Sequence, residues 1–408
     1  MAEPRVRFKR DDGSSYPPLV SGVMGDYYTE RNEKGNSSLA FLTVSIHSGI
    51  SDGELDEDSL GKRVKRTTDP AQNKKVESGD LVFNMMRAWQ GAVGCAKSAG
   101  MVSPAYVVAC PDARIYPPYM DLYVKTKPIV DQFNRLSYGA LDFRKRLYWD
   151  SFITTEINLP CIEEQQKIAD FLSSVDEVIT AGEEEVANLE TQKKVVMKKI
   201  FSQEVRFKRA DGSDFPVWEE KCLGDFARRV ARKNKGNACK LPLTISAEYG
   251  LIDQSEFFNK TVASKDMSTY YLLRKGEFAF NKSTSKDYPV GAIKRLDRYD
   301  VGAVSPLYIC FELRGDDVLS DFAVQYFETD KWHQGVLDIA QEGARTHGLL
   351  NISVPGFFET VHELPSDLEE QQKIADCLSD FDEAIAAAKK ELELWKELKK
   401  GLLQQMFV

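Results

Sequence analysis

Eight residues, Glu163-Glu-Gln-Gln-Lys-Ile-Ala-Asp170, recur without any change at positions 369–376. The block Val6-Arg-Phe-Lys-Arg10 likewise returns as Val205-Arg-Phe-Lys-Arg209. Shorter matches lie between these blocks, and they follow one another in the same order in both halves of the chain. An ordered series of this kind indicates an internal duplication with small insertions in the loops.

A strict spacing of four and three residues follows the repeated block in each half, which predicts two long helices with a coiled-coil seam. The seam positions of the first helix are Ile168, Leu172, Val175, Ile179, Gly182, Val186, Leu189, Lys193, Val196 and Ile200. Those of the second are Ile374, Leu378, Phe381, Ile385, Ala388, Leu392, Trp395, Lys399, Leu402 and Met406. The two seams match position by position, including one small residue and one lysine in each.

Two matched seams in one chain favour a pair of helices packed on each other in antiparallel orientation. We expect the lysines in the seam to fix its register, and we expect residues near the two ends of the sequence to meet. The segment Ser366-Asp-Leu-Glu369 has the pattern of a capping box that would start the second helix. The alternative for each seam is an amphipathic helix that docks on its own globular region.

The rest of each half mixes short apolar runs with Gly, Pro and Asn, which predicts an α+β globular region. The domain boundaries that follow are 1–160, 161–204, 205–365 and 366–408, with the two helices in the second and fourth segments. Strands are predicted at Leu39–Ile46, Asp80–Asn84, Ala105–Cys110, Leu241–Ser246, Glu277–Asn281 and Leu307–Leu313. Helices are predicted at Tyr119–Leu136 and Asp316–Thr329.

The net charge of −9 is concentrated in the two predicted long helices. Residues 161–203 contain 9 acidic and 5 basic residues, and residues 366–408 contain 10 and 6. The remaining residues contain 44 acidic and 43 basic side chains, so a local basic face on a globular region is compatible with the composition. The seven cysteines form no C-x-x-C pair, and neither a secretory signal nor a membrane-spanning run is present, so we expect a cytoplasmic protein.

The usual catalytic motifs do not occur in the sequence. It contains no G-x-x-x-x-G-K-[ST], G-x-G-x-x-G, H-E-x-x-H or G-x-S-x-G pattern, and its four histidines do not repeat between the halves. A duplicated enzyme would be expected to duplicate its acid, base or metal ligands. We therefore expect a chain without catalytic activity, metal or cofactor of its own.

Two segments in each half carry candidate DNA contacts. The first follows the predicted Gly-Asp/Glu strand, where arginine and glutamine would pair with guanine and adenine edges and lysine would bind phosphates. The second lies just before the last predicted strand and is rich in basic residues. The candidates in the first half are Asn84, Arg87, Trp89, Gln90, Arg144, Lys145 and Arg146; those in the second are Asn281, Lys282, Ser283, Ser285, Lys286, Arg345 and His347. The alternatives are a solvated hairpin tip and a solvated basic surface.

The chain resembles the specificity subunits of Type I restriction–modification systems over essentially its whole length. The resembling motifs are Leu159–Ala169 with Leu364–Ala375, Arg-Phe-Lys at 7–9 and 206–208, and the segment 83–92. One departure is Tyr16-Pro-Pro-Leu19, which stands where the second half has Phe215-Pro-Val-Trp218.

The resemblance implies two target-recognition domains in pseudo-symmetry, each reading one half of a bipartite DNA target, with helices that set the spacing. It also implies two methyltransferase subunits as partners, and motor-nuclease subunits in some assemblies. S-adenosylmethionine, ATP and magnesium would belong to those partners. The rival hypothesis is a non-catalytic protein–protein adaptor with two β-rich heads on a coiled coil.

Overall fold

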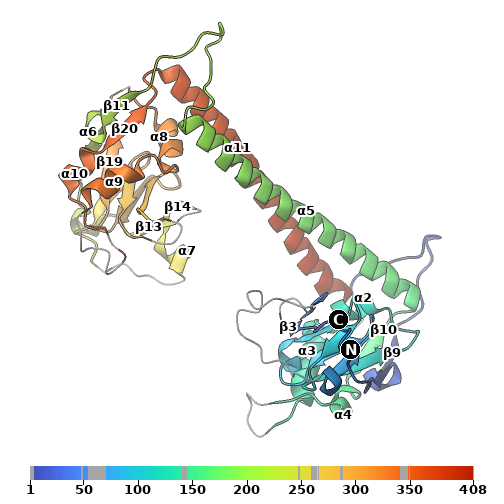
Figure 1. The fold of residues 1–408 in the computed structure, drawn as a ribbon. Coiled ribbons are helices and arrows are strands. Elements are labelled where there is room, and N and C mark those ends of the chain that lie inside the picture. Colours follow the sequence, from blue (N-terminus) through green and yellow to red (C-terminus); the bar gives the residue numbers. More distant parts are fainter. Residues whose placement is uncertain are drawn as a thin grey trace. The chain divides into compact units, whose positions relative to one another are not determined.

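The computed structural model describes residues 4–46, 49–53, 70–139, 145–246, 249–258, 264, 266–284, 288–315, 317–340, 348 and 350–407. The chain divides into two compact units, Met1–Glu183 with Lys390–Val408, and Glu184–Lys389. Each unit contains one globular head and part of each long helix (Figure 1). We call residues 1–160 head one and residues 205–365 head two.

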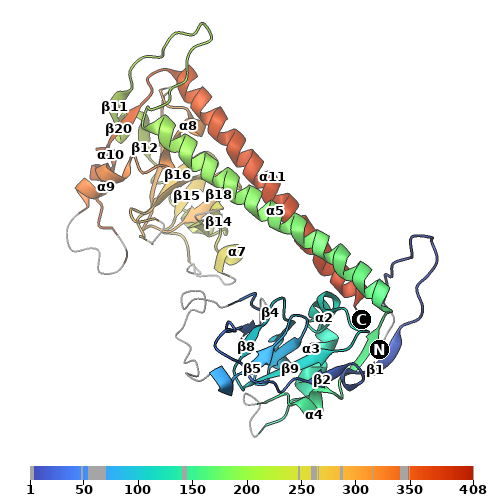
Figure 2. The same cartoon turned by 45° about the vertical axis from the view of Figure 1, so that its right-hand side comes forward.

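Both predicted long helices form. Helix α5 spans Ile162–Phe201 and helix α11 spans Leu368–Met406. Every predicted seam position on both helices is buried or half-buried, whereas most of the positions between them are exposed. The 3.5-residue period therefore identified the face through which the helices pack, and Figure 2 shows them side by side.

The two seam lysines each form an ion pair with an aspartate of the opposite helix. In the second unit the ammonium of Lys193 binds both carboxylate oxygens of Asp382, at 2.7 and 2.6 Å. In the first unit Lys399 binds one carboxylate oxygen of Asp176. These contacts are related by the duplication, and they tie one register of the seam to specific charge pairs, as expected for a polar residue within a coiled-coil seam.

A second pair of ion pairs lies beside the seam and repeats with the same symmetry. In the first unit Lys396 binds Glu183, and in the second unit Lys389 binds Glu190, both at 2.8 Å. In the first unit Asp176 pairs with Lys399, whereas Glu183, which is later on α5, pairs with Lys396, which is earlier on α11. The helices are therefore antiparallel, as predicted. Exposed pairs of this kind stabilise little individually and mainly favour one register.

The predicted capping box of α11 is wrong by one residue. The N-cap is Asp367, whose carboxylate accepts a hydrogen bond from the backbone N–H of Glu369 at 2.9 Å. This bond and the guanidinium of Arg209 lower the pKa of the Asp367 carboxyl group below its usual range. Ser366 and Asp367 are both good N-cap residues, and the helix begins at Leu368, so the aspartate occupies the position.

The repeated block at the start of α5 anchors head one to the helix. The almost fully buried carboxylate of Glu164 receives two bonds from Arg7, at 3.1 and 2.6 Å. The buried amide of Gln165 accepts a bond from Tyr116 N and donates one to Pro160 O, both at 2.9 Å. The two repeated motifs of the sequence thus bind each other.

The junction between head two and α11 has the same design. Glu370 is almost fully buried and receives bonds from Arg206 at 3.0 and 2.8 Å. Gln371 accepts from Leu319 N and donates to Pro365 O, at 2.8 Å each. One difference explains the departure noted in the sequence, because the indole N–H of Trp218 adds a bond to Glu370 at 3.2 Å that a leucine cannot supply.

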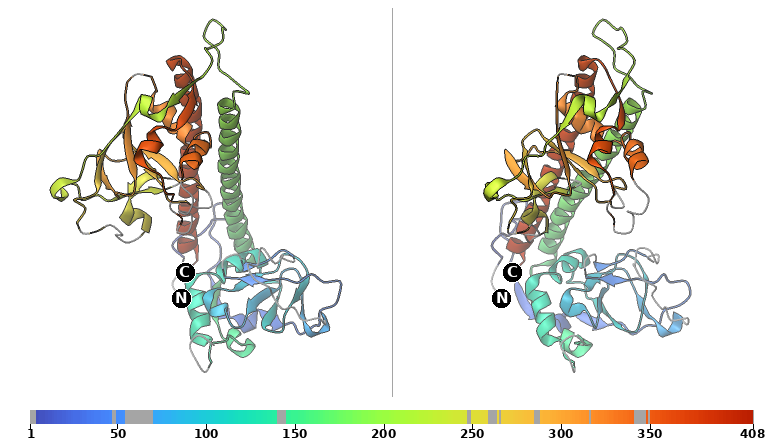
Figure 3. Two further views of the ribbon diagram at one scale, coloured as in Figure 1. Left: turned by 60° about the vertical axis from the view of Figure 1, so that its left-hand side comes forward. Right: turned by 90° about the vertical axis from the view of Figure 1, so that its left-hand side faces the viewer.

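Residues near the two ends of the sequence meet in the first unit, as predicted (Figure 3). The N–H of Val6 donates to the carbonyl of Gln405 at 3.2 Å. In the second unit the N–H of Val205 donates to the carbonyl of Lys199 at the same distance. The same backbone contact thus joins neighbouring residues in the second unit and residues from opposite ends of the sequence in the first.

The end of α11 also completes the core of head one. The ring of Phe407 is buried, with its centroid 5.3 Å from that of Tyr119 and 6.0 Å from that of Tyr123. Phe201 occupies the same place in head two and lies 5.9 Å from Tyr326. Each head is thus closed by an aromatic residue from the far end of the helix that does not start at it.

Head one consists of short strands covered by short helices. The strands are β1 (Val20–Val23), β2 (Tyr28–Glu30), β3 (Val44–Ser45), β4 (Gly49–Ile50), β5 (Lys74–Val76), β6 (Leu81–Asn84), β7 (Val93–Cys95), β8 (Gly100–Val102), β9 (Tyr106–Pro111) and β10 (Glu156–Leu159). The helices are η1 (Met24–Asp26), η2 (Pro70–Gln72), η3 (Ala88–Gln90), α2 (Pro117–Tyr123), α3 (Lys127–Leu136) and α4 (Trp149–Phe152). An antiparallel sheet with the order β2-β9-β6-β7 is flanked by the pairs β1-β10, β3-β4 and β5-β8.

Head two repeats this arrangement. Its strands are β11 (Glu219–Cys222), β12 (Ala227–Arg229), β13 (Leu243–Ser246), β14 (Gly250–Asp253), β15 (Tyr271–Arg274), β16 (Phe278–Asn281), β17 (Ala292–Arg295), β18 (Val301–Val304), β19 (Ile309–Leu313) and β20 (Val361–Leu364). Its helices are α6 (Leu223–Phe226), η5 (Lys235–Asn237), α7 (Gln254–Phe258), α8 (Ser320–Phe327), α9 (His333–Ile339) and α10 (Val354–Phe358). The sheet order β12-β19-β16-β17 matches that of head one strand for strand.

Side chains of the central strands alternate between two cores, as the period of a strand requires. In head one Leu81 and Phe83 enter the core beneath the helices, and Val82 enters a smaller core on the other face. In head two Phe278 and Ala279 divide in the same way. Both faces of each sheet are therefore covered, which explains the nearly continuous apolar runs at these strands. Among the described residues, no helix has the length and apolar content to cross a membrane.

The predicted elements of the heads agree with the structure only in part. The prediction Asp80–Asn84 corresponds to β6, whereas Leu39–Ile46 forms a strand only at β3. The predicted helix Tyr119–Leu136 is divided into α2 and α3 because Pro128, in the first turn of α3, has no N–H to donate to the carbonyl of Val124, and its ring would clash with that carbonyl in a continuous helix.

Candidate nucleic-acid interface

The loop after β6 carries the first group of candidates in head one. Asn84 ends the strand, and its side-chain oxygen accepts a bond from the N–H of Met86 at 3.0 Å. The indole N–H of Trp89 donates to the carbonyl of Met86 at 2.9 Å. Gly91 ends η3 with a φ of 96°, a conformation that favours glycine. The polar atoms of Asn84 and Trp89 that form these bonds shape the loop.

Arg87 and Gln90 lie in the same loop, but their side chains do not take part in its internal hydrogen bonds. Both side chains are exposed, and neither forms a hydrogen bond or ion pair with another residue in the described part of the chain. An arginine and a glutamine free at a loop tip provide the forked donor and the donor–acceptor pair that read guanine and adenine in the major groove. These two residues are therefore the ones that the geometry leaves available for a ligand.

Head two repeats the turn that starts this loop. The side-chain oxygen of Asn281 accepts from the N–H of Ser283 at 3.1 Å, as Asn84 accepts from Met86. Lys282 is half-buried and Ser283 is exposed. The candidates Ser285 and Lys286 lie outside the described residues.

The second candidate segment lies beside the first in head one. The N–H of Leu147 donates to the carbonyl of Met85 at 2.9 Å, which places Lys145 and Arg146 next to the loop after β6. Arg146 is exposed, and its guanidinium has no hydrogen-bond or ion-pair partner among the residues that the structure describes. Arg144 lies outside them. The structure thus joins two segments that are about sixty residues apart in the sequence.

The same junction occurs in head two. The N–H of Leu350 donates to the carbonyl of Lys282 at 3.0 Å, and that of Thr284 donates to Gly348 O at 2.7 Å. Arg345 and His347 lie outside the described residues. The segment that follows them is paired with the loop after β16, as in head one.

The structure adds two aromatic residues that the sequence had not indicated. Tyr138 is exposed and pairs through its backbone with Arg146, at 3.1 and 3.0 Å. Its ring centroid lies 5.0 Å from that of Tyr148. The two tyrosines flank the basic segment, and the backbone pairing of Tyr138 with Arg146 accompanies the contact between their rings. Tyrosines beside free arginines are suited to contacts with sugars and bases.

Among the described residues, the groups whose pKa is strongly shifted by burial lie in the cores and outside the candidate segments. Burial raises the pKa of the Cys310 thiol to about 12 and lowers that of His362 to about 4. Among the described residues, no cluster of three His, Cys, Asp or Glu side chains could hold a metal ion. The described part of the candidate interface offers exposed hydrogen-bond donors and aromatic side chains, which are groups suited to binding a ligand.

Comparison with solved structures identifies the fold. The chain matches the crystal structure of the Type I restriction–modification system S subunit from M. genitalium with a TM-score of 0.55 and 12% identity, over 100% of this chain and 99% of that one. The chain therefore has the S-subunit fold. A second match, to a structure concerned with complex assembly and conformational transition of the type I R-M system, has a TM-score of 0.53 and 15% identity over 96% of this chain and 98% of the other. No family model matches the sequence.

On this S-subunit fold the two candidate segments occupy equivalent places in the two heads. The bond between Leu147 and Met85 in head one has its counterpart between Leu350 and Lys282 in head two. The framework is shared, but the side chains differ: exposed methionine, arginine and glutamine in the first loop stand against half-buried Lys282 and exposed Ser283 in the second. The heads thus offer different chemistry at one place of a common scaffold.

Proposed function

We propose that this chain is the DNA-recognition subunit of a Type I restriction–modification complex. Each head would read one half of a bipartite duplex target, and the helices would set the spacing and bind the partner subunits. The observation that carries the proposal is the meeting of two candidate segments at the same place in both heads, with Arg87, Gln90 and Arg146 exposed and unpartnered among the described residues. The S-subunit fold supports it.

The duplication supports two copies of one partner. The helices carry most of the negative charge, and the ion pairs along them repeat with the symmetry of the two halves. Equivalent surfaces on the two units would therefore bind equivalent molecules, which we propose are two methyltransferase subunits. Motor-nuclease subunits would join some assemblies. S-adenosylmethionine, ATP and magnesium would be bound by those partners, and this chain would carry no catalytic group or cofactor.

A cytoplasmic location fits this role. All seven cysteines are free thiols, and Cys95 and Cys310 are buried in the two heads as apolar core residues. A protein that works with DNA and intracellular cofactors would keep these thiols reduced.

The test is a salt-dependent gel shift with duplex DNA, with the chain alone and with its methyltransferase partners. We expect binding that weakens as salt rises, because phosphate contacts release counterions. If the complex binds duplex DNA no better than an acidic control protein does, the adaptor hypothesis replaces ours. Incorporation of labelled S-adenosylmethionine into DNA by the pure chain alone would also refute the proposed role.

Independent reading by the two heads has its own test. In the full complex, Arg87→Ala should weaken binding by about 1–3 kcal/mol and relax the choice of base in one half of the target only. Lys97→Ala, an exposed change elsewhere in head one, is the matched control and should leave both halves unchanged. The methylated sites are mapped by sequencing, and a change in both half-targets would contradict the model of two separate readers.

A further inference from the structure

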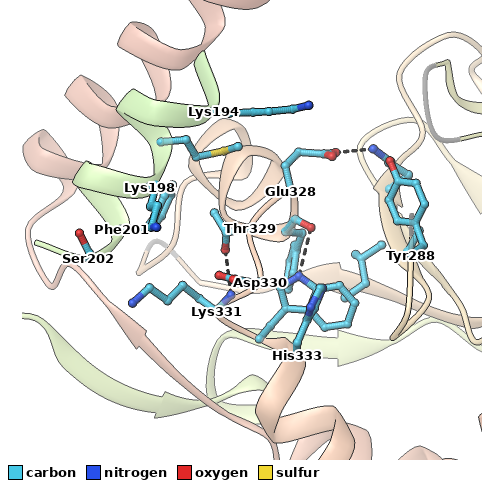
Figure 4. A pocket seen from close by; sticks show the side chains of 16 residues that line it. Lys194, Lys198, Phe201, Ser202, Tyr288, Glu328, Thr329, Asp330, Lys331 and His333 are labelled. Carbon is cyan, nitrogen blue, oxygen red and sulfur yellow. Dashed lines mark hydrogen bonds and ion pairs between the residues drawn. The ribbon is translucent and has the colours of Figure 1, made fainter. Parts of the chain in front are cut away.

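A cavity of about 540 Å³ lies in the second unit, between the last turns of α5, strand β17 and the connection from α8 to α9 (Figure 4). Its volume lies in the range of sites for small organic ligands, about 300–1,000 Å³. Figure 4 shows Lys194 extending from α5 along one edge towards the side where Tyr288 lies, while Lys198 and Lys331 lie on the side of Phe201. Its lining includes Tyr288 of the loop after β16, but none of the described candidate DNA contacts named above.

Positive charge dominates this cavity. Lys194 and Lys198 are one turn apart on α5, and Lys331 precedes α9; all three are exposed, and none forms a hydrogen bond through its ammonium or an ion pair with another described residue. The carboxylate of Glu328 is already neutralised by Lys294. Among the described lining residues, Asp330 therefore carries the one carboxylate left to oppose three ammonium groups. Lysine clusters of this kind suit a ligand with several negative charges, such as a phosphate chain.

The floor of the cavity is apolar and is formed mainly by aromatic rings. Phe201, Phe327 and Trp332 are buried in head two and line it together with Ile293. The indole N–H of Trp332 is already bound to the carbonyl of Phe327 at 3.1 Å, so this wall presents carbon atoms. An apolar wall beside a group of cations suits a ligand that has a ring at one end and phosphates at the other.

The cavity lining is not part of the duplicated scaffold. Phe407 and Phe201 occupy matching places, as do Tyr123 and Tyr326, which fixes the correspondence of the neighbouring positions. By that correspondence head one has Gln404 in place of Lys198, Pro128 in place of Lys331 and Val130 in place of His333. Head one thus lacks two of the three lysines. Residues that only supported the shared framework would be expected in both halves.

We infer that this cavity is a nucleotide-binding site, with the phosphates held by Lys194, Lys198 and Lys331 and the base against the apolar floor. The nucleotide is either free or part of a single nucleic-acid strand, since both present the same ring and phosphate. One site per chain follows, because the matching surface of head one lacks these lysines.

The test is calorimetric titration of the full chain, without duplex DNA, with ATP, adenosine and inorganic tripolyphosphate. We expect one ATP per chain and at least tenfold weaker binding of each of the other two. The double variant Lys198→Glu/Lys331→Glu should weaken ATP binding at least tenfold. Both lysines are exposed, so folding should be unaffected. Lys400→Glu, at the position on α11 that matches Lys194, is the control and should change binding less than twofold.

Two further measurements complete the test. A short single-stranded oligonucleotide that competes with ATP for the site would support the inference and identify a strand as the source of the nucleotide; if the oligonucleotide does not compete, the ligand is a free nucleotide. Absence of saturable ATP binding, equal binding by the double variant, or tripolyphosphate binding as tight as that of ATP would each overturn it. Duplex binding by the heads is measured separately, so failure here leaves the proposed function standing.

Discussion

Glu164 and Glu370 are almost completely buried carboxylates, and each is held by the arginine of the other repeated motif. A charge can remain buried only if it is paired and hydrogen-bonded, so both partners of each pair are needed. Contacts within the chain thus explain why this glutamate and its arginine recur in both halves. Their outward neighbours, such as Glu163, carry no such constraint.

Removal of the buried carboxylate should loosen head one from its helix. Glu164→Ala deletes two bonds to a charged group, so we expect the free energy of unfolding of the first unit to fall by about 1.5–3 kcal/mol. Urea unfolding followed by hydrogen exchange in each head measures the effect. Glu163→Ala, one residue earlier and exposed, should cost less than about 1 kcal/mol. Equal losses in the two variants would show that the pair has no anchoring role.

His362 gives head two a dependence on pH. The ring is buried, its nitrogens lie 3.0 Å from the Tyr326 hydroxyl and 2.8 Å from that of Thr360, and burial lowers its pKa to about 4. The unfolded chain takes up a proton below about pH 6.5, whereas the folded head does so only near pH 4. The stabilisation is complete above pH 6.5 and is lost as the pH falls towards 4.

The prediction is tested by unfolding at pH 7 and pH 5. Wild type should lose roughly 2 kcal/mol more than His362→Gln over this interval, at about 1.4 kcal/mol per pH unit below 6.5. Since the carboxylates are the same in both proteins, the difference isolates the histidine. Parallel pH profiles for the two proteins would disprove the assignment.

Which of the candidate contact residues are available could not be predicted from the sequence. The pattern pointed to the loop as a whole, but Asn84 and Trp89 use polar atoms inside it, and of its four candidates Arg87 and Gln90 are the exposed ones. Donor types are visible in a sequence, but the direction of a side chain depends on a turn that spans several residues. The bond between Met85 and Leu147 is still less predictable because it joins distant segments.

Among the helices and strands, those with a long repeating pattern of apolar residues could be predicted best from the sequence. The seam repeats at ten positions in each helix, so α5 and α11 could be predicted nearly to the residue. Strands of two to six residues offer too few positions for a reliable pattern. Leu42, for example, is tied to Met101 by one backbone bond of 2.9 Å, and that contact is set by a segment far along the chain.

The seam itself can be tested by two leucines on one helix. Leu392 is buried in the seam of α11, whereas Leu394, two residues later, is 58% exposed. Leu392→Asp should destabilise the helix pair by about 2–5 kcal/mol, because it removes apolar contact and buries a charge. Leu394→Asp should change stability by less than about 0.5 kcal/mol. Circular dichroism during urea unfolding compares them, and similar losses would mean that the helices do not pack through this face.

At the scale of the whole molecule, both heads are built on one plan, and each core includes residues from both long helices. Ile168 and Leu172 of α5 enter the core of head one together with Met406 of α11. Ile200 of α5 and Ile374 of α11 enter the core of head two. Neither head is therefore complete without the helix that starts at the other head.

Removal of the buried ring that directly follows α11 should damage head one, the head that is farther from it in sequence. Phe407→Ala deletes a buried ring from head one, and we expect a loss of about 3–5 kcal/mol there, with head two unchanged. Phe201→Ala is the matched change and should affect head two instead. Hydrogen exchange read separately in residues 1–160 and 205–365 distinguishes the two. Damage to head two by Phe407→Ala would contradict the arrangement of the cores.

The position of Phe407 also affects the order in which the protein can mature on the ribosome. Domains usually fold in the order of their synthesis, with the N-terminal one first. Here the core of head two uses residues 200–378, whereas that of head one needs residues 406 and 407 as well as 24–172. Head one is translated first but can close only after all of head two and α11 have been made. Until then its unfinished core remains exposed, so the N-terminal half of the nascent chain is the half that most needs protection from aggregation.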